Sequence, residues 1–187
     1  MTHSRYFQRV CPTQALVFCK YILFYGKMKY RIGQGYDVHA FGEGLPMWLC
    51  GVRIDSPVGF IAHSDGDVAI HALCDALLGA LALGDIGKHF PDTSDEFKGI
   101  SSAELLRRTL EMVRAKGWDV ENVDITIALQ TPRIGNRITE MRSSLASVMG
   151  VEEDCISVKA TTTEKLGFVG RKEGCEALAV ALLHSSK

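Results

Sequence analysis

Two stretches of the sequence place carboxylate and imidazole side chains at spacings that suit a metal site. In the stretch GYDVHAF, Asp37 and His39 are two residues apart near the end of an expected strand. Alternate residues of a strand lie on one face of its sheet, so both side chains are expected on the same side. A catalytic zinc commonly has three protein ligands and one open position, and these residues would supply two of the three. Because the Asp-x-His pattern is common, it is weak evidence without a third ligand.

The third candidate ligand is His71, in the stretch AHSDGDVAIHALCDALLGAL. Asp67, His71 and Asp75 follow one another at intervals of four residues, so they form one stripe along the expected helix. A neutral core histidine that hydrogen-bonds a carboxylate one turn away also explains this stripe, and the helix alone favours that simpler interpretation. Asp37 and His39 change the balance because they still need a partner. Asp67 and Asp75 are then candidates to orient the imidazole, with ordinary helix electrostatics as the alternative role.

A second polar cluster follows a later strand, in the stretch KATTTEKLGF. Residues Thr161–Glu164 offer hydroxyls, backbone N–H groups and an acid, which suit a phosphate and its divalent cation. Threonine also simply favours strands, so the cluster alone is a moderate signal. Arg171 and Lys172 are interpreted first as exposed surface rather than an anion site. Pro132 and Arg133, in the stretch TPRIG, are interpreted first as part of a turn.

The bulk properties of the 187-residue chain exclude several classes of protein. Its formal net charge is −1, so there is no basic excess for nucleic acid, and no apolar run is long enough for a membrane span. The six cysteines are scattered, which indicates reduced thiols and a cytoplasmic location. Residues 1–28 are basic and free of acidic residues, and we expect them to carry no chemistry. A start at Met28 is preferred over a targeting segment, which would imply a plastid-type address.

The pattern of apolar residues predicts one α+β domain over residues 29–187. Strands are expected at 29–39, 122–130 and 155–160, and a short hairpin or ribbon is expected over 47–61. Helices are expected from Ser64 or Asp65, as N-cap, to Leu83, at 101–117 with a capping box of Ser101 and Glu104, and at 136–150. The stretch 84–100 is expected to be a functional or mobile loop, and 175–185 is helical by propensity alone.

Taken together, four stretches of the sequence resemble one enzyme family, the 2-C-methyl-D-erythritol 2,4-cyclodiphosphate synthases. They are GYDVHAF, AHSDGDVAIHALCDALLGALALGDIGKHFPDT, NVDITI and VKATTTEKLGFVGR, and the similarity runs in unbroken order from about Tyr30 to the C-terminus. The resemblance implies a metal-dependent phosphorus–oxygen lyase of the non-mevalonate route to isoprenoids. Its substrate would be 4-diphosphocytidyl-2-C-methyl-D-erythritol 2-phosphate. The 2-phosphate would attack the β-phosphorus to give 2-C-methyl-D-erythritol 2,4-cyclodiphosphate and CMP.

The resemblance also implies an architecture. A mixed four-stranded sheet would have helices packed on one face, in a homotrimer around a threefold axis with active sites at the subunit interfaces. The segment 175–185 would then be a strand of the sheet. We prefer this implication over the helix that propensity suggests, because tertiary context routinely overrides weak propensity.

The same resemblance implies roles for individual residues. Asp37, His39 and His71 match the ligands of one zinc ion per subunit, and they also contact substrate. Glu164 matches the residue that meets a magnesium or manganese ion bound with the substrate diphosphate, while His63 and Thr162 match positions that steady the transition state. The other implied substrate-binding positions are Val38, Ser64, Asp85, Ile86, Gly87, Phe90, Pro91, Asp92, Thr93, Ser94, Leu129, Gln130, Thr131, Pro132, Arg133, Ile134, Gly135, Thr161, Thr163, Phe168 and Arg171.

Some of the implied features lie away from the metal ligands. A cavity along the trimer axis, which can hold an isoprenoid diphosphate in this family, would be lined by Tyr36, Phe168, Arg171 and Glu173. The sequence departs from the family's pattern at Ser94 in place of a common aspartate, Arg133 in place of the usual lysine, and Gln34 in place of a frequent histidine. None of these departures removes a metal ligand.

Two other functions fit the same candidate residues. A zinc-dependent phosphoesterase would use the three ligands with a water in the fourth position. A trimeric scaffold or isoprenoid-diphosphate sensor would use the zinc for structure alone. Product analysis separates the two enzymes, and the substitution His71→Ala separates a catalytic metal site from a purely structural one.

Overall fold

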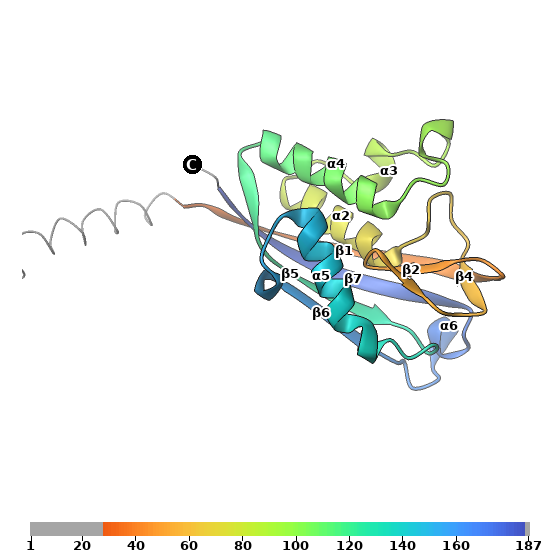
Figure 1. Cartoon of the computed structure of the whole chain (residues 1–187). Coiled ribbons are helices and arrows are strands. Elements are labelled where there is room, and N and C mark those ends of the chain that lie inside the picture. Colours follow the sequence, from red (N-terminus) through yellow and green to blue (C-terminus); the bar gives the residue numbers. More distant parts are fainter. Residues whose placement is uncertain (1–27, 186–187) are drawn as a thin grey trace, which may run out of the picture.

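Five strands form one mixed sheet in the order β4-β1-β7-β5-β6 (Figure 1), in a computed structural model that describes residues 28–185. β5 and β6 pair in parallel, and the other neighbours pair antiparallel. The bounds are β1 Tyr30–Glu43, β4 Val58–Phe60, β5 Trp118–Ala128, β6 Ile156–Thr161 and β7 Gly174–Ser185. The predictions for residues 1–28 lie outside the described residues, apart from Met28.

The sheet has one strand more than the four that were expected. The additional strand is β4, which pairs with Phe41–Glu43 at the end of β1. β2 (Met47–Leu49) and β3 (Val52–Ile54) form a separate two-stranded hairpin. The expected ribbon over 47–61 is therefore a hairpin followed by an edge strand, because the chain turns back onto β1 after β3.

Three longer helices cover one face of the sheet: α2, α4 and α5 (Figure 1). α2 lies against β1 and β7, α5 lies against β6, and α4 packs on α2. The helices are α2 Val68–Ala80, α3 Ile86–His89, α4 Ser102–Ala115, α5 Ile138–Met149 and α6 Gly167–Gly170, with 3₁₀ turns at Asp95–Phe97, Gly135–Arg137 and Glu153–Cys155. The stretch 84–100, expected as a loop, thus contains α3 and one 3₁₀ turn, and α2 stops before the predicted Leu83.

The start of α2 differs from the prediction. Its N-cap is Asp67, whose side chain accepts a 3.1 Å hydrogen bond from the N–H of Ile70, and neither Ser64 nor Asp65 caps this helix. Gly66 has a φ of +74°, a conformation that interrupts any helical path before Asp67. The cap therefore lies two to three residues later than the sequence pattern suggested.

The start of α4 is capped from a distance rather than by the predicted capping box. Ser101 is the N-cap, but its side chain makes no capping hydrogen bond, and Glu104 pairs with Arg108 one turn further along. The carboxylate of Asp65 instead accepts a 2.9 Å hydrogen bond from the N–H of Ser102. Asp65, predicted to cap α2, therefore satisfies the first turn of α4.

Glycines in β1 allow α2 to approach the sheet closely. A Cβ atom at Gly33 would lie 1.9 Å from the carbonyl oxygen of Ala76, and one at Gly35 would lie 2.0 Å from that of Ala72. No side chain fits in that space, and the facing helix residues are themselves small. The close approach sets the distance between β1 and the side chains that α2 presents to it.

β7 confirms the strand that the family resemblance implied for 175–185. Its buried face packs under α2, while the alternate residues Leu178 and Val180 are exposed. This period of two overrides the helix propensity of an alanine- and leucine-rich segment, because pairing with both β1 and β5 satisfies its backbone. The buried residues are Cys175, Ala177, Ala179, Ala181 and Leu183.

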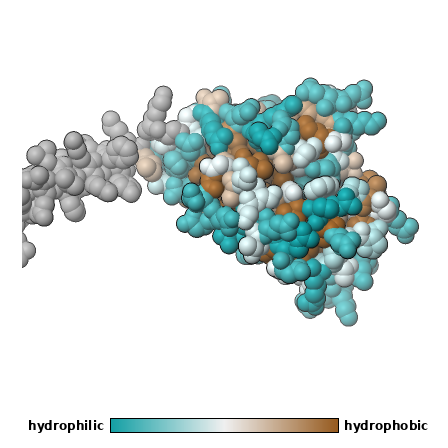
Figure 2. All heavy atoms as spheres, viewed as in Figure 1, coloured by the Kyte–Doolittle hydropathy of each residue, from teal (hydrophilic) through white to brown (hydrophobic). Residues whose placement is uncertain are grey.

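The opposite face of β1 and β7 exposes large apolar side chains. The exposed fraction is 71% for Ile32, 46% for Tyr36 and 45% for Val38, and Leu178 pairs in register with Tyr36. In contrast, hydrophilic side chains cover most of the face seen in Figure 2, with smaller hydrophobic areas between them. Among residues 28–185, no helix is both long and apolar enough to cross a membrane.

Candidate metal centre and active site

Asp37, His39 and His71 converge where α2 crosses β1. Asp37 and His39 lie on the helix-facing side of the strand, and His71 comes from the first turn of α2. The Nδ1 atoms of His39 and His71 each lie 3.0 Å from the Oδ2 atom of Asp37. One ligand atom from each residue lies within 4.8 Å of the other two. The structure thus brings together the three residues that sequence spacing had selected.

The three side chains have the chemistry of a divalent-metal site. His39 Nδ1 is buried and has no hydrogen-bond partner, although it lies 3.0 Å from the Asp37 carboxylate. Burial would raise the pKa of Asp37, but the adjacent imidazoles of His39 and His71 outweigh it and hold that pKa well below its ordinary value. A cation between two imidazole nitrogens and an ionised carboxylate would satisfy all three groups, and this donor set suits zinc.

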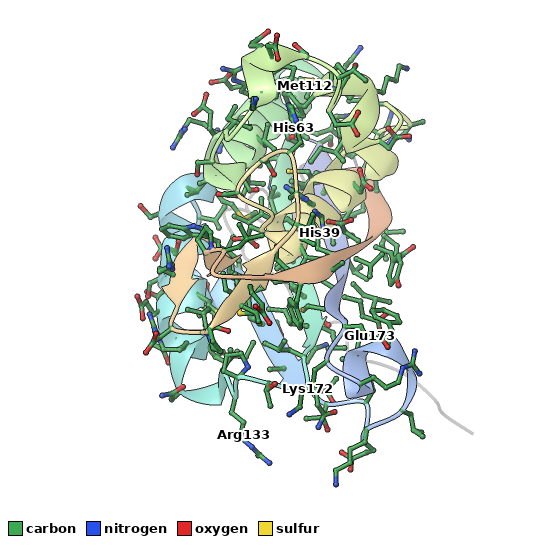
Figure 3. All side chains as sticks on the ribbon, turned by 90° about the vertical axis from the view of Figure 1, so that its right-hand side faces the viewer. His39, His63, Met112, Arg133, Lys172 and Glu173 are labelled. Carbon is green, nitrogen blue, oxygen red and sulfur yellow. The ribbon has the colours of Figure 1, made fainter. Side chains whose placement is uncertain are left out.

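A cavity of about 400 Å³ opens beside the three ligands. His39 and His71 form part of its wall, next to His63 on the segment that leads into α2 (Figure 3). Other residues predicted to bind substrate also line it, namely Ser64, Ile86, Gly87, Phe90 and Asp92. The cavity therefore has both polar and apolar walls beside the ligands, and its volume suits a small phosphorylated molecule.

Sequence reasoning missed Ala62 and three large apolar residues of this wall. Phe97, Ile100 and Leu105 line the same cavity, and Phe97 meets Phe90 edge-on with ring centroids 5.5 Å apart. Phe97 and Ile100 are the large apolar residues of an otherwise polar stretch, and this was the signal that could have identified them. Phe97 is buried, so it holds the stretch 84–100 against the rest of the protein.

Hydrogen bonds hold the cavity wall in place. His63 Nε2 lies 3.1 Å from the carbonyl oxygen of Ser94, so this nitrogen donates to the wall segment. The side chain of Ser94 accepts from the N–H of Glu96 and caps the following 3₁₀ turn, a role that its hydroxyl performs in place of a carboxylate. Asp85 caps α3 through the N–H of Lys88. Thus Asp85 and Ser94 have a clear structural role at the cavity's rim.

Neither carboxylate predicted to orient His71 contacts its ring. Asp75 accepts a 2.7 Å hydrogen bond from the N–H of Ile86, at the start of α3. The Nε2 atom of His71 instead lies 2.9 Å from Ser102 Oγ and 3.1 Å from Ser64 Oγ. Of the two roles left open, orienting the imidazole is therefore excluded, because Asp67 and Asp75 bind backbone N–H groups instead.

Asp67 is fully buried and ties the β2–β3 hairpin to α2. Its carboxylate accepts hydrogen bonds from the N–H groups of Cys50, Gly51 and Ile70 at 3.0, 2.7 and 3.1 Å. Burial raises the pKa of Asp67, and the three backbone donors oppose this shift. The residue therefore fixes the position of the helix that carries His71, without touching that side chain.

Seven of the remaining predicted residues line a second cavity of about 620 Å³, where β5 and β6 end. In Figure 3, Arg133 lies at the bottom of the view and His63 near the top, with His39 between them. The lining residues are Leu129, Pro132, Arg133, Ile134, Gly135, Asn136, Ala160, Thr161 and Thr162. Gln130 lies close by and accepts a 3.3 Å hydrogen bond from the N–H of Lys165. The two cavities share no residue within one chain.

Glu164 lies beside this second cavity rather than beside the metal ligands. The hydroxyl of Thr162 donates a 2.7 Å hydrogen bond to its carboxylate. Glu164 and Lys165 both have positive φ values, 53° and 66°, in a turn that follows β6. β7 and β5 separate β6 from β1 in the sheet, so Glu164 and Asp37 are not brought together within one chain.

Residues expected near the trimer axis lie on or beside the outer face. The Tyr36 hydroxyl donates a 2.8 Å hydrogen bond to Glu176, and Arg171 forms a two-pronged ion pair with Glu173 at 2.8 and 3.0 Å. The side chain of Val38 lies on this face as well, since it alternates with Asp37 and His39 along β1. Any contact of Val38 with substrate in the first cavity therefore falls to its backbone.

Known proteins are similar to this chain in sequence and in fold. The model of the YgbB family matches residues 30–184. A 2-C-methyl-D-erythritol 2,4-cyclodiphosphate synthase from Pseudoalteromonas atlantica is 55% identical over 159 residues, or 85% of this chain and 98% of that protein. One from Ectopseudomonas mendocina is 61% identical over 153 residues, or 82% of this chain and 98% of that protein.

A solved structure of a 2C-methyl-D-erythritol-2,4-cyclodiphosphate synthase in its CDP-bound form is also similar. It has a TM-score of 0.76 and 42% sequence identity, and the match covers 82% of this chain and 99% of that chain. The likeness thus extends over the whole sheet and its helices. With the family match and these identities over most of its length, the chain belongs to the YgbB family, the family of the 2-C-methyl-D-erythritol 2,4-cyclodiphosphate synthases.

Proposed function

We propose that this chain converts 4-diphosphocytidyl-2-C-methyl-D-erythritol 2-phosphate to 2-C-methyl-D-erythritol 2,4-cyclodiphosphate and CMP. An oxygen of the 2-phosphate attacks the β-phosphorus, and the bond from that phosphorus to the oxygen bridging the α- and β-phosphates breaks. Both groups belong to one molecule, so the enzyme folds its substrate and neutralises charge rather than supplying a nucleophile. The convergence of Asp37, His39 and His71 beside a cavity is the observation that carries the proposal.

Two metal sites are part of the proposal. Asp37, His39 and His71 hold one zinc ion per subunit, an assignment supported by their donor atoms and by the unpartnered Nδ1 of His39. Glu164 holds a magnesium or manganese ion together with the substrate diphosphate, since a carboxylate suits a hard cation. Bound metal supplies Lewis acidity and a fixed point for phosphate oxygens.

The first cavity receives the erythritol phosphate portion of the substrate. His63 and Ser64 line it beside the ligands, and Ile86, Gly87 and Phe90 form a wall that excludes water. His63, held by its hydrogen bond to the Ser94 carbonyl, steadies charge that develops during transfer. Pro91, Asp92 and Thr93 complete the rim of this pocket. Thr162 acts on the same charge from the other side of the substrate.

The second cavity receives the cytidine diphosphate portion. Its wall combines apolar residues with Arg133 and the hydroxyls of Thr161 and Thr162, a set that suits a base and its phosphates. The two cavities are separated within one chain, so one substrate bridges both only when an adjoining subunit supplies the second. This separation favours an oligomer, and together with the family resemblance it supports a homotrimer with its active sites at the subunit interfaces.

The outer face of β1 and β7 is the surface on which the trimer assembles. A monomer rarely exposes a continuous group of side chains as apolar as Ile32, Tyr36 and Val38. Phe168, Arg171 and Glu173 adjoin this face, and together with Tyr36 they line an axial cavity for an isoprenoid diphosphate. We place the enzyme in the cytoplasm, because the cysteines of the described residues, Cys50, Cys74, Cys155 and Cys175, are free thiols.

Product analysis tests the proposed reaction. The purified enzyme, supplied with zinc and magnesium and the diphosphocytidyl substrate, is expected to release CMP and a cyclic diphosphate in equal amounts, as followed by ³¹P NMR. Inorganic phosphate or an open-chain product would instead identify a zinc-dependent phosphoesterase. A protein that binds zinc but leaves the substrate unchanged would be a scaffold or sensor.

A further inference from the structure

We infer that Ser102 and Asp65 position His71 for metal binding, through a hydrogen-bonded relay that ends on the ring nitrogen facing away from the other two ligands. The inference rests on the proposed metal site, and it adds two residues that neither the sequence pattern nor the family resemblance had selected for this role. Both act through His71, so they are positioning residues rather than catalytic ones.

The two nitrogens of His71 face different partners. Nδ1 lies 3.0 Å from the Oδ2 atom of Asp37, on the side where the three ligands converge. Nε2 lies 2.9 Å from the hydroxyl oxygen of Ser102, which is fully buried. The same hydroxyl is in hydrogen-bond contact with Oδ1 of Asp65. The chain of contacts is therefore Asp65 to Ser102 to His71 to the metal site.

The direction of each hydrogen bond follows from the partners of Asp65. Its carboxylate accepts the N–H of Ser102 at 2.9 Å and the N–H of Asp67 at 3.2 Å. An ionised carboxylate can only accept, so the single hydroxyl proton of Ser102 is donated to Asp65. The oxygen of Ser102 then accepts from His71, which places a proton on Nε2, so that Nδ1 is the ring nitrogen available to a metal.

Ser64 lies beside the same nitrogen and agrees with this arrangement. Its oxygen is 3.1 Å from Nε2 of His71 and already accepts the N–H of Gly66 at 3.2 Å. A proton on Nε2 thus has two hydroxyl oxygens within reach. The ring is held on its outer edge by both serines, and only Ser102 passes the contact on to a carboxylate.

The relay stands on a rigid support. The segment before α2 pairs with the segment before α4, since Asp65 N–H donates to the carbonyl of Ile100 at 3.1 Å and Gly99 N–H donates to that of His63 at 2.8 Å. Asp65 therefore has one fixed position, and it holds the first turn of α4 as well as the Ser102 hydroxyl. The start of α4 and the ring on α2 are joined through one carboxylate.

Metal affinity tests the relay, with Ser101→Ala as the matched control. Ser101 is the neighbouring serine, and its side chain makes no capping bond. We expect Ser102→Ala to weaken zinc binding by about 10- to 100-fold, measured by competition with a coloured chelator. Ser101→Ala should bind zinc like the wild type. Loss of the same affinity in both variants, or in neither, would overturn the inference.

The proton on the outer ring nitrogen of His71 in the metal-free enzyme provides a second, independent measurement. Two-bond ¹H–¹⁵N correlation NMR is expected to show a proton on Nε2 in the wild type, beside the contact of Nδ1 with Asp37. Asp65→Asn keeps the shape but introduces an amide that can donate to Ser102, which frees the hydroxyl to donate to Nε2 and removes the proton from that nitrogen. A wild-type ring without a proton on Nε2, or an unchanged Nε2 proton in Asp65→Asn, would contradict the relay.

These measurements separate the relay from the metal site itself. A wild-type enzyme that binds no zinc would refute the proposed site, and the Nε2 proton of His71 would still decide the relay. If the wild type and Ser102→Ala bind zinc with equal affinity, the proposed metal site stands and the relay is refuted. Circular dichroism and thermal unfolding establish that each variant is folded, and Asp65→Asn carries the test if Ser102→Ala is not.

Discussion

The carboxylate of Asp75 accepts a 2.7 Å hydrogen bond from the backbone N–H of Ile86 and so joins the middle of α2 to the first residue of α3. Asp75 belongs to the helix that carries His71, whereas Ile86 lines the cavity beside the metal ligands. One side chain therefore holds the cavity wall at a set distance from the ligands. Its role is in the shape of the pocket rather than in metal binding.

Asp75→Ala should weaken substrate binding more than zinc binding. Losing a hydrogen bond to a charged acceptor costs about 1.5 kcal/mol or more, so we expect KM to rise about tenfold. Zinc affinity should stay near the wild-type value, because Asp75 does not touch the ligands. Asp75→Asn keeps an acceptor oxygen and serves as the control. An unchanged KM with lost zinc would show that Asp75 supports the ligands instead.

His71→Ala should leave a folded protein that has lost its zinc and its turnover. Removing one of three ligands eliminates the imidazole that closes the site, while the rest of α2 remains packed. Metal content by atomic emission and CMP release are the measurements. His184→Ala, at the end of β7, is the matched control and should keep both. Full turnover by metal-free His71→Ala would refute the proposed mechanism.

Gly35→Ala should destabilise the protein and loosen the metal site together. The added methyl would lie 2.0 Å from a backbone oxygen of α2, so the helix must move away from β1. We expect a loss of about 3 kcal/mol in the free energy of unfolding, with weaker zinc binding. Gly79→Ala, on the exposed side of α2, has room for its Cβ and should instead gain up to about 1 kcal/mol.

Asp67 should make stability depend on pH in a definite direction. Burial raises the pKa of Asp67 in the folded protein, so the folded protein binds this proton more tightly than the unfolded chain does. The stabilisation from protonated Asp67 is fully present below the ordinary carboxyl pKa of about 3.9, and it is lost as pH rises through the raised pKa of the folded protein. The free energy of unfolding of the wild type minus that of Asp67→Asn should therefore fall as pH rises from about 4. A difference that rises with pH would contradict the assignment.

Ile32→Glu should produce monomers. Ile32 is 71% exposed on the outer face of β1, where a charge would be buried if subunits pack there. Size-exclusion chromatography with light scattering measures the mass, and turnover should fall with the loss of the proposed trimer, in which each active site needs two subunits. Lys116→Glu, after α4, is the charge-altering control. A trimer that survives Ile32→Glu would place the interface elsewhere.

The convergence of the candidate metal ligands could be predicted from the sequence because two of them share a local period and lack a third partner. Asp37 and His39 share a strand face by alternation, and His71 was the buried imidazole on the following helix. The substrate wall was predicted through family resemblance, and the structure gathers much of it around the cavity beside the ligands. Its apolar anchor at Phe97 was missed, since a single aromatic residue in a polar loop has no period.

The partners of the carboxylates could not be predicted, because they depend on contacts between distant segments. Asp65 caps a helix that starts 37 positions later, and Asp67 binds a hairpin turn that precedes it by 16 and 17 positions. Sequence patterns indicate that such acids need donors, but they do not indicate which backbone supplies them. The pairing of β4 with the end of β1 could not be predicted for the same reason, although β4 lies within the expected ribbon.

Side chains alternate strictly along β1. The candidate metal ligands point to its inner face, and the apolar side chains at the alternate positions point to its outer face. Inserting or deleting a single residue between Gly35 and Asp37 would exchange these faces and turn the ligands to the outer face, away from α2. A change of two residues would keep the faces but move the ligands along the strand by one pleat, away from His71. This segment should therefore tolerate substitutions at its exposed positions far better than any change in its length.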